Sequence, residues 1–405
     1  MEFSNLQVTP DFQKSEFGNI CIKDDKFVIG SSDNIIVNCH NAMAYPGLIN
    51  IHDHLADNWL PKVGADRPYK NKSDWIKELQ ESEALLERKE IWDTEDFSQL
   101  TENNAMDLAL LGMYKNIFSG VVVVMDHVPL QKKAYYNNFF IDVISNYQQG
   151  HSITMKNWWG GKSLQTELEQ TNQDYPFVIH VAEGVDSNAI GEFSKMRELD
   201  LLRNNVILAQ ATNLTENELE IVAEVGASIA WSPNSNNFLL DKTFNFQKAK
   251  QLGINICLGT DSTLSGSLNI LDEIKYVRDR YPEISKRELF RMVTVNPATA
   301  LMLDDYNGRI EPGKQANLLI TKKKSDEPYD NLFKINTEDI ELLLYKGRPI
   351  TGLVEYLKFF SWDAKQYYLF DYQKSKRFVI GHPEKILQKI NSILGYEKIF
   401  DYLPF

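Results

Sequence analysis

The side chains most able to do metal chemistry in this 405-residue chain are histidines that follow short apolar runs. Seven histidines occur, and one pair, His52 and His54, stands two residues apart directly after the run 48–51. Residues i and i+2 of a strand point to the same face, so both imidazoles can reach one ion. The spacing predicts a metal site at a strand end, and two solvated histidines are the alternative.

Two further apolar runs end in residues that suit the same ion. Residues 177–179 lead into His180, a third neutral ligand, and Glu183 follows at a distance that suits proton transfer beside a metal. The run 254–258 leads to the carboxylate of Asp261. Three histidines and one aspartate leave a divalent ion with about one positive charge, which still lowers the pKa of bound water towards 7.

The apolar runs alternate with helical patterns from residue 46 onward, which is typical of a parallel sheet covered on both faces. The runs span 48–51, 121–125, 139–141, 152–155, 177–179, 206–208, 227–230 and 254–258. Eight such repeats fit a (β/α)8 barrel, whose chemistry lies where the strands end. Capping signals at Thr215 and Ser285 predict helices over 216–225 and 287–293.

The two chain ends carry a different pattern. Short β-branched runs separated by turn signals predict strands over 19–22, 26–29 and 35–37. Similar runs at 317–320 and 341–344 are placed to join them in one discontinuous sheet. The last part of the chain is rich in Tyr and Phe and predicts one helix over 384–394.

Composition restricts the partners and the compartment. A net charge of −13 repels phosphate backbones, and no basic patch interrupts it, so no nucleic-acid partner is expected. No run approaches the roughly 18 apolar residues of a membrane span, and the first residues do not read as a signal peptide. The cysteines Cys21, Cys39 and Cys257 form no Cys-x-x-Cys pair, which favours a reducing cytoplasm.

Six sequence blocks in order over residues 20–350 resemble the amidohydrolase superfamily, in the branch of cytosine deaminase and chlorohydrolase-like enzymes. The blocks are Tyr45–His54, His180–Glu183, Ser232–Asn236, Leu258–Ser262, Asn296–Ala298 and Gly308–Lys314. The resemblance implies an α/β fold, a (β/α)8 TIM-like barrel with a small β-sandwich made by both chain ends. The expected division is 1–45 and 311–358 for the β-sandwich, 46–310 for the barrel, and 359–405 for an aromatic and helical extension.

The resemblance also implies roles for individual residues. One zinc or iron(II) ion is expected per chain, with His52, His54, His180 and Asp261 as its ligands. Glu183 is expected to move a proton to the substrate, and Asp261 to take the proton of the attacking water. Lys156 follows the fourth run, near where some relatives place a carboxylated lysine between two ions, but here a solvent-facing or substrate-facing cation is expected.

The chain departs from the family at the end of the sixth run, where most members carry a histidine and this sequence has Gln210. A glutamine amide donates a hydrogen bond but cannot exchange a proton near pH 7. Loss of one such stabilising group costs about 10²- to 10³-fold in rate. His127, after the second run, is the candidate substitute, and a purely structural histidine is the equal alternative. Gln210 and His127 therefore join the candidate catalytic residues Glu183 and Asp261.

Aromatic residues after the metal pair and after the fourth run suggest flat walls for a small-molecule substrate, with Trp59 and Trp158 as predicted contacts. Loop packing is the alternative for each ring. The predicted function is metal-dependent hydrolysis of a C–N bond, namely deamination of an amine-bearing heterocycle or cyclic amidine. An amidase or lactamase and a catalytically impaired metal-binding homologue are the alternatives, and the tail 359–405 leaves a homodimer open.

Overall fold

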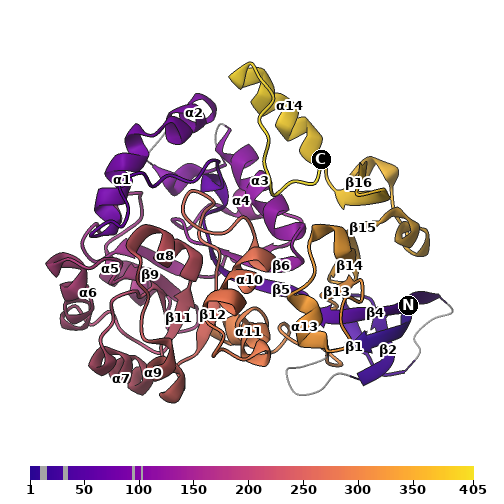
Figure 1. The fold of residues 1–405 in the computed structure, drawn as a ribbon, viewed down its shortest axis with the longest axis horizontal. Helices are drawn as coiled ribbons and strands as arrows, with labels where there is room; N and C mark the ends of the chain where they lie inside the picture. The colour runs from indigo at the N-terminus through magenta and orange to yellow at the C-terminus, as the bar shows by residue number, and fades with distance from the viewer. Residues whose placement is uncertain (10–15, 31–34, 94–95, 102–103) are drawn as a thin grey trace.

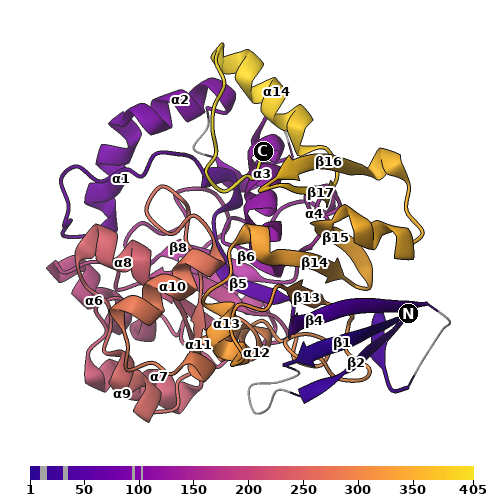
Figure 2. The same ribbon diagram turned by 45° about the vertical axis from the view of Figure 1, so that its right-hand side comes forward.

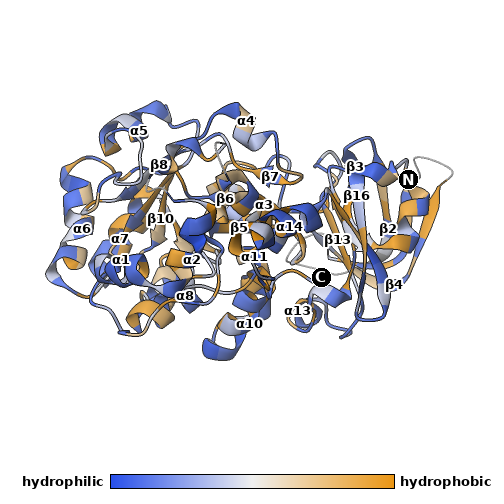
Figure 3. Ribbon diagram, turned by 90° about the horizontal axis from the view of Figure 1, so that it is seen from above, coloured by the Kyte–Doolittle hydropathy of each residue, from blue (hydrophilic) through white to orange (hydrophobic). Residues whose placement is uncertain are grey.

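The computed structural model describes residues 1–9, 16–30, 35–93, 96–101 and 104–405. In this part of the chain, helices surround parallel sheets on one side of the molecule, and a larger sheet stands beside them (Figure 1). Figure 3 shows that the strands of the parallel sheets are mostly apolar, whereas the helices around them expose hydrophilic residues. The helices are α1 Lys72–Glu81, α2 Glu83–Ile91, α3 Ala105–Ile117, α4 Lys133–Tyr136, α5 Leu164–Gln170, α6 Ser187–Glu198, α7 Glu216–Val225, α8 Pro233–Leu240, α9 Phe246–Gln251, α10 Ile270–Arg280, α11 Lys286–Met292, α12 Val295–Ala300, α13 Pro328–Leu332 and α14 Pro383–Leu394.

Eight strands form two parallel sheets, one of three strands and one of five. The first contains β5 Leu48–Asp53, β6 Val121–Asp126 and β7 Asp142–Val143. The second contains β8 Gln148–Ser152, β9 Phe177–Val181, β10 Val206–Gln210, β11 Ser228–Trp231 and β12 Ile256–Leu258. The first and last strands of this series meet, because the amide after β12, that of Asp261, donates to the His52 carbonyl of β5 at 3.0 Å.

The expected strands agree with the structure at six of eight runs, and the third and fourth runs were placed wrongly. Residues 139–141 precede β7 rather than form it, and β8 occupies Gln148–Ser152 instead of 152–155. The polar sequence of β8 hides the strand from a hydrophobicity pattern. The side chains of Gln149, His151 and Ser152 are nevertheless buried, and the Gln149 amide oxygen accepts a hydrogen bond from Trp159 Nε1 at 3.0 Å.

The predicted helices are confirmed within one or two residues. A capping box at Thr215 opens α7, which ends at Gly226 in a left-handed conformation. A second capping box, at Ser285, opens α11, and α14 begins at Pro383. Local signals therefore determine where these helices begin, because each cap satisfies amide groups that the helix itself leaves free.

Both chain ends contribute to one nine-stranded sheet, in the order β16-β17-β15-β14-β13-β4-β1-β2-β3 (Figure 2). Its strands are β1 Glu2–Val8, β2 Glu16–Lys23, β3 Lys26–Val28, β4 Ile36–Pro46, β13 Leu318–Thr321, β14 Ile340–Tyr345, β15 Arg348–Leu353, β16 Tyr367–Tyr372 and β17 Ser375–Ile380. The ends join where β4 and β13 run antiparallel, with Tyr45 opposite Leu319. The sequence pattern missed β1, β15, β16 and β17.

The C-terminal segment returns to the first parallel sheet. Helix α14 lies beside α2 and α3 (Figure 1), and the Lys389 ammonium pairs with Asp107 of α3. Further on, the Tyr402 hydroxyl donates to the Asn58 carbonyl at 2.9 Å, in the loop that follows β5. The aromatic tail thus packs on its own chain near the strand that carries the histidine pair. Among the described residues, no helix is both long and apolar enough to cross a membrane.

Candidate metal centre and active site

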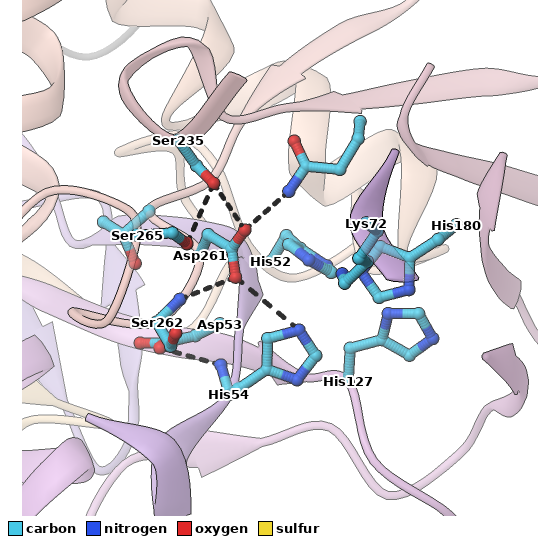
Figure 4. Close-up of polar contacts among 12 residues, drawn as sticks. His52, Asp53, His54, Lys72, His127, His180, Ser235, Asp261, Ser262 and Ser265 are labelled. Carbon is cyan, nitrogen blue, oxygen red and sulfur yellow. Dashed lines mark hydrogen bonds and ion pairs between the residues drawn. The ribbon is translucent and has the colours of Figure 1, made fainter. Parts of the chain in front are cut away.

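Four buried histidines lie together at the carboxyl ends of the parallel strands (Figure 4). His52 and His54 come from the end of β5, His127 directly follows β6, and His180 is in β9. Each offers one ring nitrogen, and these four nitrogens lie within 4.8 Å of one another. The expected ligands His52, His54 and His180 are therefore brought together, and His127 joins them.

The electrostatic surroundings favour neutral imidazoles. Burial lowers the pKa of His52 and of His54 to about 3, and it lowers the pKa of His127 and His180 well below the ordinary value of 6.5. A neutral imidazole has a free lone pair for a metal, whereas a protonated ring has none. Both nitrogens of His52, and Nε2 of His180, are buried without a hydrogen-bond partner among the described residues. Buried polar atoms of this kind fit a metal that the protein binds.

Asp261 lies beside the four histidines, with Oδ1 3.7 Å from His54 Nε2. The backbone amide of Ser262 donates to Oδ1 at 2.7 Å, while Gln210 Nε2 and Ser235 Oγ donate to Oδ2 at 2.7 and 2.9 Å. Burial acts to raise the pKa of Asp261, but the positive charge of Lys72 and the hydrogen bond from the Ser262 amide oppose this, and the pKa lies below its usual range. The carboxylate is therefore ionised. Its hydrogen bonds to Ser262, Gln210 and Ser235 fix its orientation, and Oδ1 faces His54.

Gln210 is a partner of Asp261 rather than an isolated group at the end of β10. Its amide nitrogen donates to Asp261, and its amide oxygen accepts a hydrogen bond from the Asn236 side chain. Because each end of the amide has one partner, its orientation is fixed. Ser235 and Asn236 both belong to the start of α8, which explains why this polar segment lies at the site.

Glu183 lies just after β9, in the expected position near the histidines. Burial raises the pKa of its carboxyl to about 7, and the charge of Lys72 partly opposes this rise. The Lys72 ammonium is 3.1 Å from Glu183 Oε2, and the Lys72 amide donates to the Glu183 carbonyl at 3.2 Å. Sequence reasoning missed Lys72, since a single lysine at the start of a helix carries no motif. Only the pairing of the start of α1 with the segment after β9 brings it to Glu183.

An apolar cavity opens from the metal-binding group. His54, Lys72 and Asp261 line one part of it, and most of the remaining wall is aromatic or aliphatic. The apolar lining includes Trp75, Ile76, Leu79, Leu85, Phe97, Trp158, Trp159 and Leu264. The ring of Trp159 lies 5.7 Å from that of His54, so a flat substrate in the cavity has an aromatic surface beside the metal-binding residues.

The remaining residues that the sequence analysis singled out lie partly inside and partly outside this cavity. Trp158 and Trp159, the aromatic pair after the fourth run, both line the cavity. Trp59 is outside this lining, because its Nε1 donates to Glu87 at 2.7 Å and its ring packs against Phe400. Lys156 is exposed beyond the end of β8, as expected for a solvent-facing cation.

Comparison with known proteins identifies relatives of this chain. The model of the amidohydrolase family matches residues 164–355. A 5-methylthioadenosine/S-adenosylhomocysteine deaminase from Caldanaerobacter subterraneus is 22% identical over 375 residues, which cover 78% of this chain and 83% of that protein. The guanine deaminase of Mus musculus is 30% identical over 197 residues, 45% of this chain and 41% of that enzyme.

The fold is similar to that of solved hydrolases. The atrazine chlorohydrolase of Arthrobacter aurescens TC1, solved with zinc, superposes with a TM-score of 0.69 at 15% identity, over 97% of this chain and 99% of that one. The family match, the deaminase relatives and this fold agree with the six sequence blocks. The match over residues 164–355 and the deaminase relatives support the amidohydrolase superfamily for this chain, and the solved chlorohydrolase shares its fold.

Proposed function

We propose that this chain is a metal-dependent hydrolase that cleaves a C–N bond by deaminating an amine-bearing heterocycle or a related cyclic amidine. The observation that carries the proposal is the group of buried histidine nitrogens flanked by two carboxyl groups, Asp261 and Glu183, at one end of the parallel strands. The deaminase relatives support the same chemistry. In this proposal the two sheets are parts of one (β/α)8 barrel, and the nine-stranded sheet of both chain ends forms the β-sandwich domain.

One zinc or iron(II) ion fits the donor set, with His52, His54, His180 and Asp261 as the expected ligands. When bound, it supplies an acidified water molecule for attack on the substrate. Asp261 would accept a proton through Oδ1, which accepts one hydrogen bond, from the Ser262 amide, whereas Oδ2 accepts two, from Gln210 and Ser235. These two donors hold the carboxylate in place during the transfer.

Glu183 carries the second proton transfer. A carboxyl group with a pKa near 7 gains and loses a proton with similar ease at neutral pH, so it suits transfer to a leaving nitrogen. The Lys72 ammonium limits the motion of this carboxyl and offsets its charge when it is ionised. The aromatic walls formed by Trp75, Trp158 and Trp159 stack on a planar ring and exclude water around it.

The amidase alternative depended on Gln210 as a donor to a substrate oxyanion. In the structure one N–H of the Gln210 amide donates to Asp261, which gives Gln210 a role in holding that carboxylate. Deamination of a small heterocycle, in the cytoplasm and without nucleic-acid or membrane partners, is therefore the function that we propose.

Ammonia release from a panel of aminopurines, aminopyrimidines and aminotriazines tests this function, with aryl amides and lactams as the competing class. Glu183→Gln is expected to abolish ammonia release while the bound metal stays at the wild-type level. Glu273→Gln is the matched control, because burial raises the pKa of Glu273 to about 7 as well, yet this residue is outside the cavity lining. Retained turnover in Glu183→Gln, or hydrolysis of the amides alone, would contradict the proposal.

A further inference from the structure

We infer that His127 is a metal ligand of this chain, in addition to the histidines at 52, 54 and 180. The resemblance to the family gave His127 no such role, and the sequence left it between a substitute catalytic group and a structural residue. The inference goes beyond the proposed function and depends on it only in that both need a bound metal.

The position of the ring supports this assignment. The centroid of the His127 ring lies 4.5 Å from that of His180 and 5.2 Å from that of His52. The four candidate nitrogens are at most 4.8 Å apart. Because Asp261 is also an expected ligand, the ion would have more than four ligands, and nitrogens at about 2.1 Å from it would lie about 3.0–3.6 Å apart, so each ring has to move by about 1 Å or less.

The orientation of the ring supports it independently. His127 Nε2 bonds the Gly150 carbonyl at 3.1 Å, and His180 Nδ1 bonds the next carbonyl of β8, that of His151, at 2.9 Å. A hydrogen bond from the second ring nitrogen to a backbone carbonyl is typical of metal-bound histidines, since it fixes the ring and its tautomer. Strand β8 therefore orients His127 and His180 in the same way.

The remaining nitrogen of each ring is left for a ligand. His127 Nδ1 and His180 Nε2 are both buried and have no hydrogen-bond partner within the described parts of the chain. His151 Nδ1 is also buried without a partner among the described residues, but His151 is not one of the four histidines whose nitrogens lie within 4.8 Å of one another. Because buried polar atoms are rarely unpaired, the free nitrogen of His127 within this group indicates a bound ion.

The role inferred for His127 is related to the absence of a histidine at the end of β10, where most family members have one. Gln210 occupies that position and is engaged by Asp261 and Asn236, so it offers no nitrogen to the metal. His127 reaches the histidine group from the other end of the strand series, next to Trp159, whose ring is 5.2 Å away. The chain thus lacks a histidine at the end of β10 and has an additional one, His127, at the end of β6, beside the three expected histidine ligands.

The first test measures zinc affinity by competition with a chromophoric chelator. His127→Gln keeps a group that can donate to the Gly150 carbonyl but removes the ligand nitrogen. We expect its zinc affinity to fall by more than about 100-fold, the upper range for changes outside the ligand shell. His151→Gln is the matched control, because His151 is equally buried and has an unpartnered Nδ1 within the described chain, yet lies outside the group of four. Wild-type affinity in His127→Gln, or equal losses in both variants, would overturn the inference.

The second test needs no variant and therefore does not depend on folding of a mutant. X-ray absorption of the zinc-loaded wild-type protein should require four imidazole ligands, and three would overturn the inference. Failure of the proposed function is a separate result. A protein with four imidazoles on zinc that releases no ammonia refutes the function alone, whereas an active deaminase with three refutes the role of His127 alone.

Discussion

Two sets of buried polar side chains lie on opposite sides of β5, and they differ in how completely they are hydrogen-bonded. On one side, the fully buried Lys115 of α3 donates to Asp53, Asn58 and Thr260 at 3.0, 2.8 and 3.1 Å. On the other side, the equally buried His52 has no partner among the described residues for either ring nitrogen.

Three consecutive residues of the chain thus have two different roles: Asp53 stabilises the fold, and His52 and His54 belong to the candidate metal site. Asp53 stands between the two histidines in sequence, but alternation along the strand turns it towards Lys115. Its carboxylate also accepts from Asn58 and Asn116, at 3.1 and 2.8 Å. A buried charge with complete hydrogen bonding holds the fold together, whereas buried nitrogens without partners mark the place where an external ion completes the structure.

The largest expected effect is on stability, from Lys115→Met. This change leaves the Asp53 carboxylate buried without its cation, and breaking a buried pair in this way costs about 3–5 kcal/mol. Urea unfolding of the metal-free protein at constant pH measures the loss. The double variant Lys115→Met with Asp53→Asn should lose less than the single variant, because it leaves no unpaired charge. Equal losses would mean that the pair is not what stabilises this side of β5.

His52→Ala should weaken metal binding strongly and leave the metal-free fold intact, whereas Lys115→Met should mainly reduce stability. We expect metal affinity to fall by more than about 100-fold, since a ligand is lost. The metal-free variant should still fold, because no hydrogen bond from the His52 ring is broken among the described residues. Elemental analysis and far-UV circular dichroism check the two parts. Full metal content in the variant would remove His52 from the site.

A smaller effect is expected from the residues that orient Asp261. Gln210→Leu removes one of two donors to Oδ2 and should lower kcat by about 10- to 100-fold, below the loss typical of a group that stabilises the transition state directly. Ser235→Ala removes the other donor and should have a similar or smaller effect. Steady-state kinetics on the best substrate of the panel, with metal content measured in parallel, tests this. Unchanged kcat in both variants would show that Asp261 needs no positioning.

The smallest effect concerns Lys72 and pH. Glu183 gives its proton from the protonated form, so the rate should fall as the pH rises through about 7. Lys72 holds this pKa down, and Lys72→Met should therefore move the fall in rate to higher pH, with about a 10-fold change in kcat or less. The pH profile of kcat measures the shift. A shift to lower pH would contradict the electrostatic role of Lys72.

Much of the site was predictable because strand ends and residue spacing are local features. The histidine pair, His180 with Glu183, and Asp261 each follow an apolar run that the sequence displays, and six of the eight runs are strands of the structure. The polar strand β8 was misplaced, because its burial depends on partners such as Trp159 that lie outside the strand. The contact of Lys72 with Glu183 could not be predicted for a related reason, since it joins the start of α1 to the segment after β9, which is far away in the chain.

By itself, the sequence determined the alternation of strands and helices, the helix caps and the side of β5 that carries His52 and His54, because backbone periodicity and capping act within a few residues. Only the tertiary structure decided that His127 faces the same point as His180, that Gln210 is engaged by Asp261, and that Trp159 rather than Trp59 lines the cavity. These outcomes depend on hydrogen bonds and packing between residues that only the closed fold brings together. That some histidine nitrogens lack a hydrogen-bond partner among the described residues can likewise be recognised only in the folded chain, where their neighbours are known.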